Sequence, residues 1–222
     1  MTILDHPSRV TSGSATRRGV RAVAADAVAV QGRVAAVADG VGDTEQAALA
    51  ARGAVDVAVH VAAAGRGPLA AVLAAAAAVR QSTEAGDAVL VVAAGRADGG
   101  WDVAWVGDAV ALLHDGRVVR PVTHEHTVAA QLRAQGVRVA PQWDNVVTTS
   151  LRTVRPDEVG TASCPPGTLV LLTDGVHRTL EPGEIADAIT GSPDPQRAAE
   201  RLVEAALAAG AQDNVTAAVL AG

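Results

Sequence analysis

Four aspartates in this sequence stand where apolar segments end or begin. They are Asp39, Asp108, Asp174 and Asp213, and the first three each have an adjacent glycine. Carboxylates gathered at one end of a sheet repel one another unless a cation neutralises them, and oxygen ligands suit Mg²⁺ or Mn²⁺. The pattern therefore indicates a site for a hard divalent ion. The alternative for each residue taken alone is an ordinary turn, because aspartate and glycine are common turn formers.

The elements that would position these acids are short apolar strands and alanine-rich helices. We predict strands over Val20–Val30, Arg33–Ala38, Ala88–Ala94, Trp101–Val106, Ala109–His114, Arg117–Val119, Leu169–Thr173 and Val215–Leu220. We predict helices over Glu45–Ala64, Pro68–Gln81, Glu125–Gln135, Glu184–Ile189 and Pro195–Ala209. Consecutive strands joined by tight turns favour antiparallel sheets, so the fold class is α+β. We expect one domain over residues 1–222, with residues 1–12 as a flexible N-terminal extension.

The composition excludes several kinds of chemistry. The chain has 222 residues and no Lys, Phe or Tyr, so all 18 of its basic residues are arginines. Without lysine there is no Walker-type phosphate loop, kinase site or Schiff base. No Gly-x-Ser-x-Gly elbow supplies a serine nucleophile. The single Cys164 cannot form an internal disulfide, and we expect it to be a bystander in a turn.

Charge and hydropathy bear on partners and location. The net charge of −6 argues against nucleic acid as a partner. The longest apolar run, Leu69–Val79, is too short to cross a bilayer, and residues 1–9 contain no secretory core. We therefore expect a cytoplasmic protein with no membrane partner.

Several short motifs, in this order along the chain, resemble those of the metal-dependent (PPM, type 2C) serine/threonine protein phosphatases. Each motif is weak alone, and their common order makes the resemblance specific over nearly the whole chain. We identify the sequence as similar to a divergent, bacterial-type member. The segments are Gly19-Val20-Arg21 through Asp26, Val37-Ala38-Asp39-Gly40-Val41-Gly42, Val106-Gly107-Asp108, His126-Thr127 with Leu132 to Gly136, Leu171-Leu172-Thr173-Asp174-Gly175-Val176, and Gln212-Asp213-Asn214-Val215-Thr216.

The resemblance implies a fold and a set of roles. The fold would be a four-layer αββα sandwich of two antiparallel sheets, each covered by a pair of helices. Asp39, Asp174 and Asp213 would hold one Mn²⁺ or Mg²⁺, and Asp39 would bridge to a second ion with the Gly40 carbonyl. Asp108 would belong to a third, weaker metal site. Arg21, Asp39 and Asp174 would be the catalytic residues, with the Arg21 guanidinium gripping the substrate phosphate.

The sequence also departs from the family pattern. Ala24 replaces an amide, and Ala25 replaces a residue that reaches the second metal, so we expect the second of the two ions to be held less tightly. Arg178 occupies the position of a second acid of the third site. Further departures are Val41, Asp43 and Ala109-Val110.

Two functions from different classes remain. The first is a phosphatase that hydrolyses phosphoserine and phosphothreonine in proteins by means of a metal-activated water. The alternative is a pseudophosphatase that keeps the fold and binds or regulates a phosphoprotein. The resemblance implies phosphorylated serine/threonine proteins as partners, with a cognate kinase or an anti-sigma-factor pathway as the setting.

Other residues that could do chemistry have simpler interpretations. His124-Glu125-His126 lacks a third zinc ligand at usable spacing, so a solvated loop is expected. His177 could be a polar neighbour of the site or an ordinary loop histidine. Trp101 and Trp105 are four residues apart in a strand, hence on one face, and are expected to pack in the core.

Overall fold

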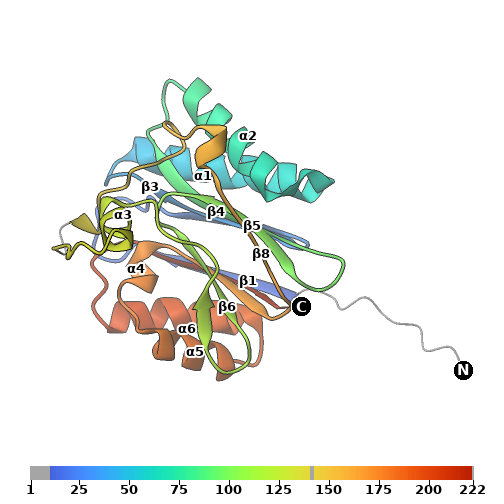
Figure 1. Cartoon of the computed structure of the whole chain (residues 1–222). Coiled ribbons are helices and arrows are strands. Elements are labelled where there is room, and N and C mark those ends of the chain that lie inside the picture. The colour runs from blue at the N-terminus through green and yellow to red at the C-terminus, as the bar shows by residue number, and fades with distance from the viewer. Residues whose placement is uncertain (1–10, 141–142, 222) are drawn as a thin grey trace, which may run out of the picture.

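Two five-stranded antiparallel sheets face each other at the centre of the fold (Figure 1). The computed structural model describes residues 11–140 and 143–221. One sheet has the strand order β1 (Thr11–Arg17), β10 (Val215–Ala221), β9 (Thr168–Leu172), β6 (Val110–His114) and β7 (Val119–Pro121). The other has the order β2 (Ala27–Gln31), β3 (Val34–Gly40), β4 (Ala88–Gly95), β5 (Trp101–Val106) and β8 (Gly160–Cys164).

Helices cover the outer face of each sheet. Helices α1 (Glu45–Val61) and α2 (Gly67–Gln81) pack on the β2–β8 sheet, and α5 (Pro182–Thr190) and α6 (Pro195–Ala208) pack on the β1–β7 sheet (Figure 1). Two shorter helices, α3 (Val128–Ala134) and α4 (Asp174–His177), lie near one end of the sheets. This arrangement confirms the predicted α+β class and the four-layer αββα sandwich.

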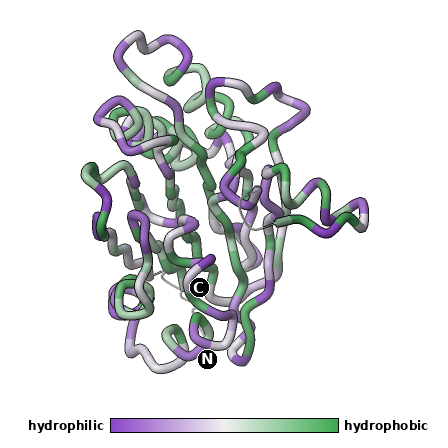
Figure 2. The backbone as a smooth tube through the Cα atoms, turned by 90° about the vertical axis from the view of Figure 1, so that its left-hand side faces the viewer, coloured by the Kyte–Doolittle hydropathy of each residue, from purple (hydrophilic) through white to green (hydrophobic). Residues whose placement is uncertain are grey.

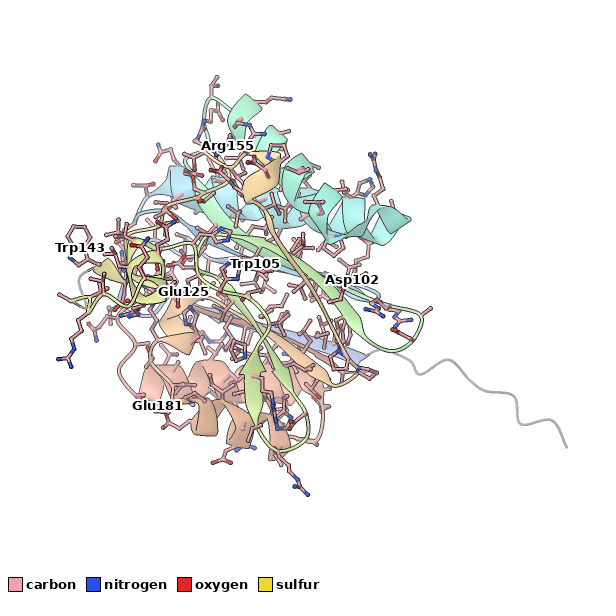
Figure 3. The ribbon with its side chains drawn as sticks, viewed as in Figure 1. Asp102, Trp105, Glu125, Trp143, Arg155 and Glu181 are labelled. Atoms are coloured by element: carbon pink, nitrogen blue, oxygen red, sulfur yellow. The ribbon has the colours of Figure 1, made fainter. Side chains whose placement is uncertain are left out.

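Three apolar layers hold the sandwich together, and they consist mainly of Ala, Val and Leu. Figure 2 shows the hydrophobic residues gathered on the central strands. The layer between the sheets contains Trp105 (Figure 3) and Trp101, both fully buried, together with Leu171 and Leu220 from the opposite sheet. The two tryptophans therefore pack between the layers, as predicted from their spacing. They supply bulk that the alanines cannot, because aromatic side chains bury the largest areas.

The helical stretch from Glu45 to Gln81 is long and apolar enough to cross a bilayer by length and composition alone. It is not one straight helix. Gly65 and Gly67 adopt positive φ angles of 81° and 78°, and α1 and α2 lie against each other on the sheet (Figure 1). Their buried alanines belong to the core beneath them.

The structure corrects several predicted boundaries. The strand predicted over Val20–Val30 is formed only from Ala27 onward, and residues 19–23 form a turn and a bend. The helix predicted from Glu125 begins at Val128, because the Thr127 side chain caps it by accepting the Ala130 N–H at 3.1 Å. The predicted extension over residues 1–12 lies outside the described residues as far as position 10, and Thr11 and Ser12 begin β1.

Four of the described elements were not predicted, namely β1, β8, α4 and a 3-10 helix over Pro156–Glu158. The strands β1 and β8 are too polar to show an apolar pattern, and each is formed by pairing along an edge, β1 with β10 and β8 with β5. Helix α4 has only four residues.

Candidate metal and phosphate site

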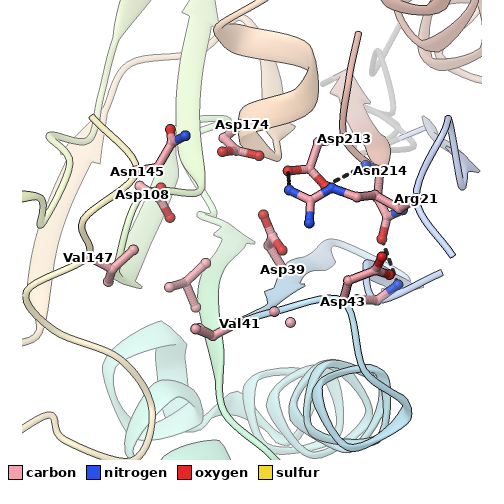
Figure 4. A pocket seen from close by; sticks show the side chains of 14 residues that line it. Arg21, Asp39, Val41, Asp43, Asp108, Asn145, Val147, Asp174, Asp213 and Asn214 are labelled. Carbon is pink, nitrogen blue, oxygen red and sulfur yellow. Dashed lines mark hydrogen bonds and ion pairs between the residues drawn. The ribbon is translucent and has the colours of Figure 1, made fainter. Parts of the chain in front are cut away.

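A cavity of about 140 Å³ opens at one end of the sandwich, and four aspartates face it (Figure 4). They come from both sheets: Asp39 from the end of β3 and Asp108 from the β5–β6 turn, Asp174 from the start of α4 and Asp213 from the residue pair before β10. The structure thus brings together all four acids predicted from the ends of apolar segments. The residues that line the cavity are Arg21, Ala25, Asp39, Gly40, Val41, Gly42, Asp43, Val89, Asp108, Asn145, Val147, Asp174, Asp213 and Asn214.

Asp39 lies at the centre of this group (Figure 4). Its carboxylate makes no hydrogen bond or ion pair with any residue that the structure describes. Burial raises its pKa well above the ordinary value, and the neighbouring Asp26, Asp174 and Asp108 raise it further. A carboxylate in these surroundings is costly to ionise unless a cation approaches it.

Asp174 begins α4, and its two carboxylate oxygens have different surroundings. Oδ1 is buried and has no hydrogen-bond partner among the described residues, whereas Oδ2 lies 3.1 Å from Nη1 of Arg178. The glycine that follows allows close packing: a Cβ on Gly175 would lie 2.0 Å from the carbonyl oxygen of Asn214. The Asp-Gly pair therefore places the carboxylate at the cavity by packing α4 directly on the start of β10.

Asp213 is paired with Arg21, the residue predicted to bind phosphate. Nη2 of Arg21 lies 2.5 Å from Oδ2 of Asp213, and the two side chains are 40% and 31% exposed. The structure brings Arg21, the predicted phosphate ligand, to the cavity. There its guanidinium forms an ion pair with the carboxylate of Asp213, a predicted metal ligand.

Asn214 positions the segment that carries Arg21, a role that the sequence reasoning missed. Its Oδ1 accepts the Ala25 N–H at 2.6 Å, and its Nδ2 donates to the carbonyl oxygens of Arg18 and Val23 at 2.6 and 3.1 Å. These bonds hold residues 18–25 in turns. The signal was present in the Asp-Asn pair before β10, because asparagine has both a donor and an acceptor with which to bond backbone groups.

Asp26, the last residue of the N-terminal motif, is buried behind the cavity. Its Oδ2 accepts the Thr173 hydroxyl at 2.8 Å, and its Oδ1 is buried without a partner among the described residues. Burial raises the pKa of Asp26 to about 7; hydrogen bonds from Thr216 and Thr173 lower it, and the nearby Asp174 adds to the rise.

Gly40 and Ala25, two further residues of the family-like motifs, also line the cavity. Gly40 donates its N–H to the Ala25 carbonyl at 3.2 Å, and a Cβ at this position would meet the Ala47 carbonyl oxygen at 2.6 Å. Ala25 itself lines the cavity and is buried. A methyl group therefore lies at the position where the resemblance implied a side chain that would reach the second metal.

Asp108 is bound by an arginine. Nη2 of Arg178 lies 2.7 Å from its Oδ2, and the Asp108 side chain is only 7% exposed. Burial raises the pKa of Asp108 to about 6, Asp174 raises it further, and Arg178 opposes the rise. The resemblance implied a metal here, and the structure places a guanidinium instead.

We can ask whether the acids fit a divalent ion at two places, one between Asp39, Asp174 and Asp213 and the other at Asp108. Among the described residues no group of three acidic, histidine or cysteine side chains converges closely enough to hold a metal as the side chains lie. Two of the acids are instead drawn to arginines, Asp213 to Arg21 and Asp174 to Arg178. The Asp39 carboxylate, which has no bonded partner among the described residues, and the buried, unpartnered Oδ1 of Asp174 fit a hard cation, because they are carboxylate oxygens at the cavity without a hydrogen-bond donor. Asp108 does not fit one.

The histidines lie beside the site without forming a metal centre. The His177 side chain is 9% exposed, its Nε2 lies 3.0 Å from the Asp108 carbonyl oxygen, and desolvation lowers its pKa to about 4. It is therefore neutral at physiological pH and close to the site rather than an ordinary loop residue. His124 and His126 pack around Trp105, whose Nε1 donates to the His124 carbonyl oxygen at 2.8 Å.

No protein-family model and no curated protein match the sequence, whereas solved structures do. The PPM Ser-Thr phosphatase MsPP from Mycobacterium smegmatis, in complex with cacodylate, is 30% identical, with a TM-score of 0.79 over 96% of this chain and 99% of that chain. The catalytic domain of the serine/threonine protein phosphatase PstP, in complex with two manganese ions, is 25% identical, with a TM-score of 0.80 over 96% and 98%. PppA, a key regulatory component of the T6SS in Pseudomonas aeruginosa, is 24% identical and shares the fold, with a TM-score of 0.83 over 96% and 98%.

Proposed function

Because the chain belongs to the PPM family of Ser/Thr phosphatases, we propose that it is itself an active, metal-dependent phosphatase. Its reaction would be hydrolysis of phosphoserine and phosphothreonine esters in proteins. The observation that carries the proposal is the carboxylate of Asp39, which has no hydrogen bond or ion pair among the described residues, together with the buried, unpartnered Oδ1 of Asp174. Both residues line the cavity that Arg21 also lines.

Asp39, Asp174 and Asp213 would hold the cation, Mn²⁺ or Mg²⁺, with Gly40 beside them. A bound divalent ion supplies a water of lowered pKa and neutralises charge on the phosphoryl oxygens. The residues of the chain orient this chemistry. Asp39 is fixed by β3, and Asp174 by the packing of α4 on β10, so neither carboxylate depends on a long loop for its position. The second ion would be held less tightly, since Ala25 offers no oxygen.

Arg21 would bind the substrate phosphate. Its guanidinium is 40% exposed at the cavity, and its planar fork matches two phosphate oxygens. Only Nη2 of this guanidinium bonds Asp213, so Arg21 would meet the phosphate at the cavity that both residues line. Arg21 would therefore hold the phosphoryl group in line with the water and balance the charge that develops on it.

The protein substrate would be a phosphorylated serine/threonine protein, in the setting of a cognate kinase or an anti-sigma-factor pathway. The cavity supports this in one respect, since its small volume admits a phosphoryl group rather than a whole folded segment. A cytoplasmic location, with no nucleic-acid or membrane partner, remains part of the prediction.

The test is hydrolysis of p-nitrophenyl phosphate and of a phosphothreonine peptide at saturating Mn²⁺. We expect metal-dependent turnover by the parent and a loss of at least about 100-fold in Asp174→Asn, because that change removes an anionic ligand while keeping the shape of the side chain. Asp56→Asn, at an exposed position of α1, is the matched control and should retain full activity. Absence of turnover in the folded parent would contradict the proposal.

Two observations favour the alternative of a pseudophosphatase. Ala25 presents a buried methyl group to the cavity, and Arg21 already occupies Asp213. A chain of this kind would bind a phosphoprotein without hydrolysing it. Retained binding of the phosphothreonine peptide, lost in Arg21→Ala and accompanied by no turnover at any Mn²⁺ concentration, would identify this function.

A further inference from the structure

Arg178 departs from the family pattern, follows α4 and bonds residues from four separate segments. Its Nη2 lies 2.7 Å from Oδ2 of Asp108 and 3.2 Å from Oε2 of Glu125, and its Nη1 lies 3.1 Å from Oδ2 of Asp174. Nη1 also donates to the Oδ1 of Asn145. The guanidinium is thus surrounded by three carboxylates and one amide oxygen.

This surrounding shell consists only of oxygen atoms. Three carboxylates and an amide carbonyl are the donors that a hard divalent cation takes in proteins. The shell is closed to solvent on the side of Asp108 and Asp174, whose side chains are 7% and 16% exposed. The side chains of Arg178 and Glu125 are 21% and 26% exposed, and Asn145 is an exposed residue. Carboxylates buried in this way need a positive charge, and here that charge is covalently attached to the chain and permanent.

Asp174 separates this shell from the place where Asp39 lies. Its Oδ2 is taken by Arg178, and its Oδ1 has no partner among the described residues. The Asp174 carboxylate therefore binds the Arg178 guanidinium through Oδ2, while its Oδ1 has no partner among the described residues.

We propose that Arg178 is a resident cation that takes the place of a divalent metal at Asp108, and that it closes the Asp108–Glu125–Asp174 shell to metal ions. This inference deepens the proposed function, on which it rests for the ion at Asp39. The chain binds metal through Asp39, Asp174 and Asp213 alone. Removal of the guanidinium opens a new cation site lined by Asp108, Glu125 and Asn145.

The experiment counts Mn²⁺ ions bound per chain, by the electron paramagnetic resonance signal of free Mn²⁺ during titration. Arg178→Ala should bind one more Mn²⁺ than the parent. Adding Asp108→Asn to Arg178→Ala should remove the extra ion. Arg178→Lys keeps a positive charge in the shell and should bind as many ions as the parent. Equal numbers of bound ions in the parent and in a folded Arg178→Ala would overturn the proposal.

A second measurement does not depend on whether Arg178→Ala folds. Asp108→Asn in the parent should leave the number of bound Mn²⁺ ions unchanged, because Asp108 holds no metal there; the loss of an ion would contradict the inference. Counting also separates this inference from the proposed function. A parent without turnover contradicts only the enzyme, while an extra ion in Arg178→Ala still supports the resident cation.

Discussion

Asp39, Asp108, Asp174 and Asp213 carry the same side chain in four different surroundings. Asp108 and Asp213 each lie against an arginine, Asp174 divides its oxygens between a guanidinium and an unbonded position, and Asp39 has no bonded partner among the described residues. The chemistry available to each carboxylate follows from the cation beside it, because burial alone favours the neutral acid. At the scale of the residue, this makes pH a direct probe of the acids that lack a cation.

Asp26→Asn tests the cost of the buried carboxylate behind the cavity. The pKa of Asp26 is raised to about 7 by burial, so the folded state favours its protonated form. The resulting stability is present at low pH and is lost as the pH rises through about 7, with a penalty of up to about 4 kcal/mol. Asparagine resembles the protonated acid and can still accept from Thr173. In EDTA, we expect the unfolding free energy of the parent to fall between about pH 4 and pH 8 more steeply than that of the variant.

Urea titrations across this pH range measure the difference. If the two proteins lose stability in parallel as the pH rises, the Asp26 carboxylate is already ionised at low pH in the folded state and the prediction is wrong. Asp56→Asn at an exposed position provides the matched control, and its pH profile should follow that of the parent.

At the scale of the element, the short helix α4 and the turns around it position the acids. Close contacts between backbone segments hold these elements in place. Helix α4 has four residues and too few hydrogen bonds to be stable alone. Its position depends on the contact of Gly175 with β10, where the carbonyl oxygen of Asn214 occupies the space that a Cβ would need. Asn214 in turn holds residues 18–25, so one position next to β10 supports both sides of the cavity.

Gly175→Ala should destabilise the fold by about 2 kcal/mol or more and lower turnover as well, because the added methyl would lie 2.0 Å from the Asn214 carbonyl oxygen. Gly183→Ala is the matched change, since a Cβ in this first turn of α5 meets nothing within 4 Å. It should raise stability by about 0.5–1 kcal/mol through the helix propensity of alanine. Chemical denaturation measures both, and equal effects of the two changes would contradict the packing argument.

At the scale of the molecule, the cavity is lined by residues from both sheets. Asp39 ends β3 of one sheet, and Asp174 and Asp213 belong to segments that adjoin β9 and β10 of the other. Between the sheets, the core consists mainly of small side chains with two tryptophans. An ion shared by these acids would therefore link the sheets and bind only the folded chain.

Mn²⁺ should raise the melting temperature of the protein, and EDTA should reverse the effect. At free Mn²⁺ of about 100 times its dissociation constant, linkage gives about 2.7 kcal/mol, or a shift of roughly 5–10 °C for a domain of this length. Asp39→Asn should lose most of the shift, and Asp56→Asn should keep it. Scanning calorimetry measures the shift, and the same increase in Asp39→Asn as in the parent would place the ion elsewhere.

Much of the fold could be predicted from local sequence patterns, since β4, β5, β9 and β10 are apolar runs bounded by turn residues. The edge strands β1 and β8 could not be predicted, because their strand character comes from the neighbouring strand and not from apolar alternation. The error over Val20–Val30 has a related cause. Alternating residues there are held in turns by the side chain of Asn214, which lies about 190 positions away.

The sequence by itself determined which residue types meet at the site, because strand ends are local and an acid after an apolar run emerges at the end of a sheet. It placed Arg21 and the four aspartates there through the order of the motifs. Only the tertiary structure decided which cation each acid has. Arg178 reaches Asp108 across 70 positions and Glu125 across 53, and these distances close only when both sheets are packed. Electrostatic pairing depends on distance in space, which spacing along the chain does not specify.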